Sequence, residues 1–354
     1  MEYGSEFDLN ANPPYAGAAS IPDSWQLFRS GRDALRAFAR LAGRRRVLMP
    51  ALCCASMLLP FAQNGCEIGF YRLREDLSAE EGDVRARLRD GDVLLYMRYF
   101  GIKPFDDGFL EGLRREGRGL LFLEDRTHDI LVRNREEGFR PDAAAASLRK
   151  WAALPEGGML ETHLGTYAAQ TDTHYGDLRL EAMEKKSRFL ETGDPALRAA
   201  YTDMLRRAES MLDEDSEPIA MHPRYRELLE GLDLDAILAA RRRNLRRLQA
   251  RLATLAEDGT IRLVTPAPER SGLYLPILVQ NRDAVQRKLF ARRIYCPSAI
   301  WPEPKEAAGV CPVSRHVTEH MIAVLCDQRY HDADMDYLAD NLMEAIREEN
   351  GHVY

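Results

Sequence analysis

Two stretches of sequence decide the fold class: LLFLED at residues 120–125 and AAAASLRK at residues 143–150. The first is an apolar run that ends in two acids, and the second is a run of small residues that leads to a lysine. Both patterns are typical of buried β-strands, so Asp125 and Lys150 are expected at the carboxyl end of a strand or just beyond it. Ligands of an open α/β sheet bind beyond this edge, which makes both side chains candidate ligand groups.

Outward from these two strands, short β-like runs alternate with helical stretches between residues 30 and 160. Strands are expected at residues 46–49, 67–72, 92–100, 119–124 and 144–148, and helices at 33–42, 55–64, 79–88 and 109–116. This alternation predicts parallel strands joined by crossover helices, which is an α/β sheet.

Three segments are expected along the chain. Residues 1–24 are rich in Gly, Pro, Asn and Ala and are expected to form an arm with little core of its own. Residues 25–235 are expected to form a large domain that ends in charged helices over 175–215, broken at Gly193-Asp194-Pro195. Residues 236–354 are expected to form a linker helix and a small C-terminal α+β domain, with a strand at 272–279, a helix at 282–292, strands at 294–296 and 321–326, and a helix at 332–348.

The linker helix is expected over residues 233–256, where leucines recur every seven residues at Leu238, Leu245 and Leu252. Six arginines lie in the same stretch. We interpret them as the solvated face of an amphipathic helix rather than as a nucleic-acid stripe, because the formal net charge of the chain is −7. These residues are Arg241, Arg242, Arg243, Arg246, Arg247 and Arg251.

Composition excludes several classes of partner. The acidic balance argues against nucleic acid, and no apolar run approaches the ~20 residues that cross a bilayer. Six cysteines without a CxxC pair and an acidic N-terminus without an apolar signal region predict reduced thiols and a cytoplasmic protein. The spacing of His316 and His320 suits a metal on a helix, but no third ligand is evident, so we predict no metal site.

The candidate ligand groups match the demands of pyridoxal phosphate (PLP). This cofactor needs a lysine for its Schiff base and a carboxylate that keeps the pyridine nitrogen protonated, and its phosphate binds well at a helix N-terminus. Lys150 and Asp125 fit the first two requirements, and the helix that begins at Ser30-Gly31 fits the third. Each signal alone has an ordinary explanation, namely a solvated lysine, a loop-capping acid and a capped helix.

Together these residues resemble a known family. In chain order, Ser30-Gly-x-x-Ala-Leu, Val47-Leu-Met-Pro50, Glu-Asp125-x-x-His128 and Ser147…Lys150…Gly-Gly158 resemble the DegT/StrS family of PLP aminotransferases, which aminate keto-sugars attached to nucleotides. The resemblance runs from about residue 30 to residue 345. It implies the aspartate-aminotransferase fold, fold type I, in which a large domain with a mostly parallel sheet flanked by helices precedes a small α+β domain.

The resemblance assigns three residues to the chemistry. Lys150 would hold the cofactor and move a proton, Asp125 would bind the pyridinium nitrogen, and His128 would lie near the ring hydroxyl. The phosphate of the cofactor would be held by a second group of residues, Gly31, Arg32 and Ser147.

Two features of the site depart from the family pattern, namely the residue over the cofactor ring and the length of the loop before Lys150. Cys54 falls where many relatives place an aromatic side chain over the ring, and cysteine would pack there as a small, soft group. Only two residues separate Ser147 from Lys150, which makes this loop short. Three arginines could hold substrate carboxylates or phosphates. They are Arg98, Arg149 and Arg329.

A third departure concerns the subunit interface. The family's Gly-Tyr-Asn segment, by which a neighbouring subunit reaches the phosphate, is replaced by Met221–Arg226. We expect a homodimer with the active site at the interface, in which Arg224 or Tyr225 takes over this contact. The alternative is that both residues only cap the turn at residues 227–231.

The resemblance implies an aminotransferase that moves an amino group from a donor such as glutamate to a keto acceptor. The expected acceptor is a keto-sugar, which could be linked to a nucleotide. Two alternatives stay open. Another PLP reaction at the amino-acid Cα would use the same lysine and aspartate. A non-catalytic binding or regulatory protein would keep the fold without the chemistry.

Overall fold

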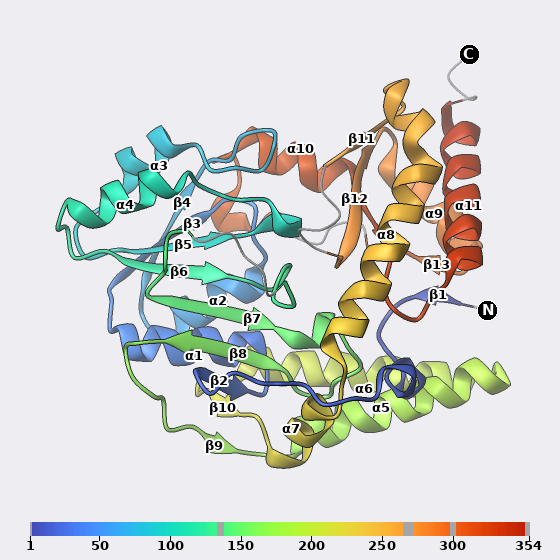
Figure 1. The fold of residues 1–354 in the computed structure, drawn as a ribbon, viewed down its shortest axis with the longest axis horizontal. Helices are drawn as coiled ribbons and strands as arrows, with labels where there is room; N and C mark the ends of the chain where they lie inside the picture. Colours follow the sequence, from blue (N-terminus) through green and yellow to red (C-terminus); the bar gives the residue numbers. More distant parts are fainter. Residues whose placement is uncertain (1, 133–137, 265–271, 298–301, 351–354) are drawn as a thin grey trace.

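The structure is a computed structural model that describes residues 2–132, 138–264, 272–297 and 302–350. It has a large α/β unit and a smaller one, with one long helix running beside both (Figure 1). The two units have separate hydrophobic cores, one around the large sheet and one around the small C-terminal sheet. This arrangement confirms the expected fold class.

The large sheet has nine strands among the described residues, in the order β4-β3-β5-β6-β7-β8-β2-β10-β9. The first five are parallel to one another, which confirms the expected crossover topology. Their bounds are β4 (Glu67–Tyr71), β3 (Arg46–Pro50), β5 (Val93–Met97), β6 (Leu121–Asp125) and β7 (Ala143–Ser147). Asp125 and Ser147 therefore end two adjacent parallel strands at the same edge of the sheet.

The other four strands extend this sheet in a mixed arrangement that the sequence did not predict. β8 is antiparallel to β7 and to β2, and β10 is antiparallel to β2. Their bounds are β8 (Gly158–Thr162), β2 (Trp25–Phe28), β10 (Ile219–Ala220) and β9 (Gln170–Thr171). Short strands without clear alternation form because the neighbouring strands supply hydrogen-bond partners, and this information is not local.

Seven α-helices of the large unit lie among the residues that the structure describes. Their bounds are α1 (Gly31–Ala42), α2 (Ala55–Gln63), α3 (Glu81–Arg87), α4 (Asp107–Arg115), α5 (His174–Thr192), α6 (Pro195–Glu214) and α7 (Pro223–Glu230). The break between α5 and α6 lies where the sequence placed it, because Gly193 ends α5 at φ 71° and the Asp194 side chain caps α6. The two helices then pack against each other in antiparallel fashion, along the lower edge in Figure 1.

In its described part, the C-terminal unit contains the antiparallel sheet β11-β12-β14 and four α-helices. Its strands are β11 (Ile261–Leu263), β12 (Tyr274–Val279) and β14 (Met321–Leu325), and its helices are α8 (Leu234–Glu257), α9 (Arg282–Ala291), α10 (Pro312–His320) and α11 (Asp332–Asn350). A separate pair joins β13 (Ile294–Tyr295) to β1 (Tyr3–Gly4) of the N-terminal arm. The arm therefore begins on the small unit.

Helix α8 links the two cores. Leu238, near its N-terminal end, packs in a cluster of the large unit, whereas Leu245 and Leu252 pack in the core of the small one. The interpretation of its arginines as a solvated face is right for Arg246 and wrong for Arg241, which is 1% exposed. The guanidinium of Arg241 is buried because backbone carbonyls and a glutamine accept its hydrogen bonds.

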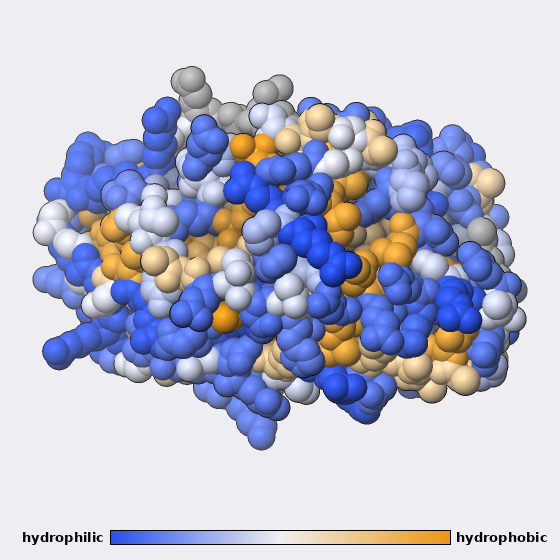
Figure 2. Space-filling model, turned by 90° about the horizontal axis from the view of Figure 1, so that it is seen from below, coloured by the Kyte–Doolittle hydropathy of each residue, from blue (hydrophilic) through white to orange (hydrophobic). Residues whose placement is uncertain are grey.

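The outer surface is mainly polar. Figure 2 shows the face seen from below, on the side of α5 and α6, where hydrophobic residues are visible in separate areas among hydrophilic ones. Among the described residues, no helix combines the length and the apolar character needed to cross a bilayer.

Candidate active site

A cavity of about 350 Å³ lies at the carboxyl edge of the large sheet. Seven of the twelve residues that the sequence singled out line it: Gly31, Arg32, Cys54, Asp125, Ser147, Arg149 and Lys150. The walls are completed by the start of α1, by α5 and α6, by Tyr274 of the small unit and by the N-terminal arm. The fold thus brings the predicted cofactor groups together from segments that are far apart in the chain.

Lys150 ends a short 3₁₀ turn, Leu148–Lys150, that directly follows β7. Its side chain is exposed and faces the cavity. Its carbonyl oxygen accepts a hydrogen bond of 3.3 Å from the buried Arg241. The short spacing between Ser147 and Lys150 is accommodated by this tight turn, which keeps both residues in the cavity wall.

Asp125 is the last residue of β6 and is 6% exposed. Its Oδ1 accepts the Thr127 backbone N–H at 2.8 Å. Burial raises the pKa of Asp125 above the ordinary value, although hydrogen bonds from Thr127 and the charge of Lys150 act in the opposite direction. A buried carboxylate in this position is stabilised by a cation in the cavity.

Thr127 is a positioning residue that the sequence did not reveal. Besides its bond to Asp125, its hydroxyl accepts the Ser147 backbone N–H at 3.1 Å, and its carbonyl accepts the indole N–H of Trp151 at 2.7 Å. One residue therefore ties the end of β6 to the loop that carries Lys150.

His128 is fully buried and does not line the cavity, contrary to the position that the resemblance implies. Its Nδ1 accepts the Phe100 backbone N–H at 3.2 Å, which puts the proton of the neutral ring on Nε2. Burial and the charge of Lys150 hold the pKa of His128 well below the ordinary value, so the ring is neutral. Phe100 has φ 51°, a strained conformation in which its ring packs 4.8 Å from the imidazole.

The start of α1 provides backbone donors at the cavity. The Ser30 hydroxyl caps the helix by accepting the Asp33 N–H at 3.2 Å, while the first N–H groups of a helix have no acceptor within it. At Gly31 a Cβ atom would lie 3.2 Å from the Cβ of Ser147, so glycine lets the start of the helix approach the end of β7 closely. At Gly158 a Cβ atom would lie 2.0 Å from the Ser30 carbonyl oxygen. Gly158 is therefore required by the close approach of the chain's own backbone.

The side chain of Arg32 is committed to helix α6. It forms ion pairs with Glu209 and Asp213, each at 2.9 Å. Arg32 could therefore contribute its backbone N–H to a phosphate site. The positive charge of its guanidinium is already paired with Glu209 and Asp213.

Cys54 caps α2 and lines the cavity, as the resemblance implies. Its sulfur lies 2.8 Å from the Ser56 hydroxyl. A thiol in this place offers less contact area than an aromatic ring.

Two of the three candidate substrate arginines lie elsewhere. Arg98 pairs with Glu124 at 2.6 Å and does not line the cavity, so its predicted role is not supported by its position. Arg329 lines an adjoining cavity of about 320 Å³ that Lys150 also lines, and there it pairs with Asp327 at 2.8 Å. Arg149 alone of the three lines the main cavity.

The segment expected to cross a subunit interface is built into its own chain. Tyr225 is fully buried, and its hydroxyl donates to Asp177 at 2.6 Å. Arg224 is exposed and pairs with the same carboxylate at 3.0 Å. Neither residue lines the cavity of its own chain; residues 227–230 belong to helix α7 rather than to a turn, and His222 caps the start of this helix by accepting the Arg224 N–H. The buried position of Tyr225 is inconsistent with a reach into a second subunit.

Sequence reasoning missed the wall opposite the sheet. Ser5, Glu6 and Phe7 of the arm line the cavity together with Arg179 of α5 and Glu209 of α6. The residues Ser5–Phe7 gave no sequence signal because an acid and an aromatic residue in an irregular segment are ordinary features of a surface.

The histidine pair stays apart from this site. His316 and His320 lie on α10, with ring centroids 4.2 Å apart. Within the described part of the chain, no group of three or more metal-binding side chains is formed by His, Cys, Asp or Glu.

Comparisons with known proteins connect this geometry to one fold. No protein-family model matches the sequence, and no curated protein matches it. Among solved structures, the chain is similar to DesI in the presence of its TDP-sugar product, with 18% identity, coverage of 92% of this chain and 81% of that one, and a TM-score of 0.66.

Two further structures give the same result. Helicobacter pylori PseC, an aminotransferase involved in the biosynthesis of pseudoaminic acid, shares 12% identity over 92% of this chain and 87% of its own, with a TM-score of 0.63. A DegT DnrJ EryC1 StrS aminotransferase from Brucella abortus shares 18% identity over 90% and 85%, with a TM-score of 0.58. At these identities the likeness establishes the fold: the chain has the architecture of sugar aminotransferases.

Proposed function

We propose that this chain is a PLP-dependent aminotransferase whose active site is the cavity at the carboxyl edge of the large sheet. The observation that carries the proposal is the convergence of Lys150 and Asp125 on one cavity. A lysine and a buried acid at the ends of adjacent strands are the two groups that this cofactor requires. Structurally similar proteins include one solved in PLP and PMP forms, which supports the same cofactor.

The residues present fit the cofactor. Asp125 is buried with a raised pKa, and a protonated pyridine nitrogen is the cation that would stabilise its charge. The start of α1, where Gly31 lines the cavity and the first N–H groups have no acceptor within the helix, suits a phosphate, with Ser147 beside it. When bound, the cofactor supplies the electron sink that makes a Cα proton of the amino donor acidic.

The chain's own residues would do the remaining work. Lys150 would hold the cofactor covalently and afterwards carry the proton between donor and cofactor carbons, because its side chain faces the cavity. Asp125 would keep the pyridine nitrogen protonated. The neutral His128 would stabilise the ends of the neighbouring strands by accepting the Phe100 N–H.

The substrates we propose are an amino-acid donor, glutamate, and a keto acceptor, a keto-sugar. The fold shared with sugar aminotransferases supports this class. The charge of the cavity supports it as well, because Arg149, which lines it, can hold an anionic group of either substrate. We further propose a homodimer, since an isologous pair could bring a second copy over the open side of the site.

The function is tested by spectroscopy of the purified protein with added PLP. The expected result is a visible absorption band that decays on addition of glutamate, with formation of 2-oxoglutarate. The matched variant Lys150→Ala should lose both signals. Wild-type protein that shows the band but no change with any amino donor would contradict the transaminase assignment and favour a binding protein.

A further inference from the structure

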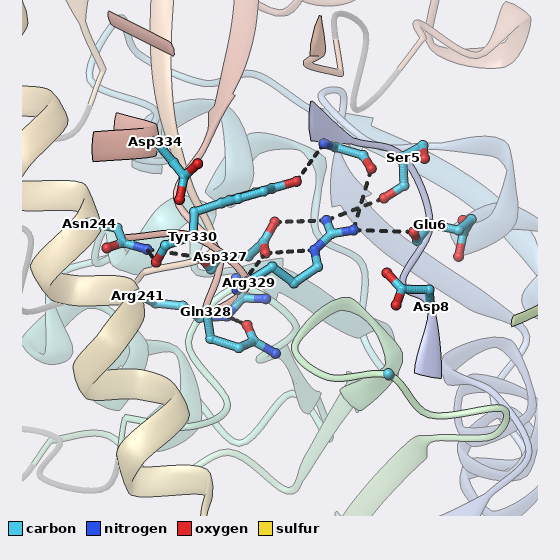
Figure 3. Close-up of polar contacts among 12 residues, drawn as sticks. Ser5, Glu6, Asp8, Arg241, Asn244, Asp327, Gln328, Arg329, Tyr330 and Asp334 are labelled. Carbon is cyan, nitrogen blue, oxygen red and sulfur yellow. Dashed lines mark hydrogen bonds and ion pairs between the residues drawn. The ribbon is translucent and has the colours of Figure 1, made fainter. Parts of the chain in front are cut away.

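The arm wall of the cavity, residues Ser5–Phe7, is fixed by cations from both units. The buried Lys186 of α5 donates to the Ser5 hydroxyl at 2.7 Å and to the carbonyl oxygens of Gly4 and Glu6. From the small unit, Arg329 donates to the Gly4 and Glu6 carbonyl oxygens at 3.4 and 3.3 Å. Figure 3 shows the Arg329 guanidinium between Asp327 and the backbone of this arm. The backbone of the arm is therefore held tightly.

The side chain of Glu6 is held far less. Its carboxylate makes one short contact, an ion pair of 3.0 Å between its Oε2 and Arg179, and the side chain is 52% exposed while it lines the cavity. Its partial enclosure in the cavity would raise the pKa of Glu6, but the charges of Arg179, Arg149 and Lys186 outweigh this effect and hold the pKa below the ordinary value. The carboxylate is thus ionised, and its half-exposed side chain is accessible to a competing anion.

The arginines around Glu6 offer more N–H donors than the neighbouring carboxylates can accept. Glu209 is shared by three of them, at 2.9 Å from Arg32, 3.5 Å from Arg149 and 3.6 Å from Arg179. Within the described residues, the Nε of Arg149 and the Nε of Arg179 are buried without a hydrogen-bond acceptor. Without Glu6, this corner of the cavity would carry an excess of positive charge, and a carboxylate is the partner that planar guanidinium groups bind best.

We propose that Arg149 and Arg179 form a subsite for a carboxylate group of the substrate, and that Glu6 occupies this subsite until the substrate displaces it. The inference rests on the proposed function and names the group that the cavity recognises. The resident side chain has the same terminal carboxylate as the proposed glutamate donor, so the ligand and Glu6 would compete for the same guanidinium donors.

The test is calorimetric titration of the full chain with glutarate, a dicarboxylate that cannot react. Glu6→Gln keeps the size of the side chain but removes its charge. It should bind glutarate roughly 10–100-fold more tightly than wild type, because charge-assisted hydrogen bonds are no longer occupied from within. Glu181→Gln, on the surface of α5 and outside the lining of the cavity, is the matched control and should leave the affinity unchanged. Equal affinities in Glu6→Gln and wild type would overturn the proposal.

A second arm of the experiment separates substrate from cofactor. If the subsite belongs to a substrate carboxylate, the protein loaded with PLP should still bind glutarate, and inorganic phosphate should not compete strongly in the loaded form. Loss of glutarate binding on loading would assign the arginines to the cofactor phosphate and overturn the substrate assignment. A protein that takes up no PLP contradicts the proposed function, whereas titration of the cofactor-free variants still decides whether Glu6 competes with an external carboxylate.

Discussion

The cavity has two walls that are built in different ways. The sheet wall contains Asp125, Ser147 and Lys150, which come from two adjacent strand ends within 26 residues of sequence. The arm wall joins Glu6 to Arg179, 173 residues away, and its backbone to Arg329, more than 320 residues away. Strand ends are visible in local patterns of sequence, whereas contacts of such sequence separation depend on the completed fold.

The walls also differ in their electrostatics. On the sheet wall, one carboxylate and one ammonium face a common space, and burial raises the pKa of Asp125. On the arm wall, three arginines share two glutamates, and the charges of Arg179 and Arg149 lower the pKa of Glu6 against the effect of burial. We infer that the sheet wall serves the cofactor and the arm wall serves an anionic group of the substrate.

The largest expected effect is on the sheet wall. Lys150→Ala should leave the fold intact, since the side chain is exposed, but should lower the rate of amino transfer by at least roughly 10²–10⁴-fold through loss of the proton carrier. Lys185→Ala is the control, because Lys185 lies outside the cavity lining and pairs with Glu181 on the surface of α5. Single-turnover kinetics with glutamate measure the difference. A Lys150→Ala rate within tenfold of wild type would mean that another group transfers the proton.

Asp125→Asn should weaken cofactor retention. Loss of a charge-assisted hydrogen bond in a buried site costs about 1.5–3 kcal/mol, which corresponds to roughly 10–150-fold in the dissociation constant of PLP. The control is Asp142→Asn at the opposite edge of the same sheet, where the carboxylate accepts the Phe122 N–H at 2.8 Å. Equilibrium dialysis gives both constants. If both variants retain PLP as wild type does, Asp125 only caps its loop.

Arg241→Met should destabilise the loop that joins the two walls. Arg241 donates to the Trp151 carbonyl oxygen at 3.0 Å and to Gln328 at 2.8 Å, and buried acceptors left without donors cost about 1–3 kcal/mol each. Arg246→Met on the exposed face of the same helix should change the free energy of unfolding by no more than about 0.5 kcal/mol. Urea unfolding of the two variants measures both changes in the free energy of unfolding. Equal effects would show that burial of Arg241 contributes little to stability.

This pair of arginines shows where sequence reasoning reached its limit. Periodicity identified the helix and its leucines, but it assigned Arg241 and Arg246 to one solvated face. On the helix, Arg241 lies beside the buried leucine stripe. The carbonyls of a loop that is distant in sequence enclose it there, and helix periodicity does not reveal where that loop passes. In the same way, Lys150 and Asp125 were found by their places at strand ends, whereas Glu6 and Thr127 could be recognised only once the fold placed them.

The smallest expected effect concerns the interface prediction. Arg224→Ala removes an exposed ion pair with Asp177 and should change stability by less than about 1 kcal/mol. Sedimentation should show a dimer for the wild type and the variant alike. Cofactor retention that weakens in Arg224→Ala would support a contact across subunits, while unchanged retention would limit Arg224 to the turn of its own chain.

Chemical trapping decides whether Lys150 is the residue that holds the cofactor. The protein is incubated with PLP, the covalent bond is reduced with borohydride, and the digested peptides are sequenced by mass spectrometry. We expect a pyridoxyl group on Lys150, in the peptide that contains Trp151 or ends before it. A label on Lys186, which already binds the arm through three oxygen atoms, or on no lysine at all, would show that Lys150 does not hold the cofactor.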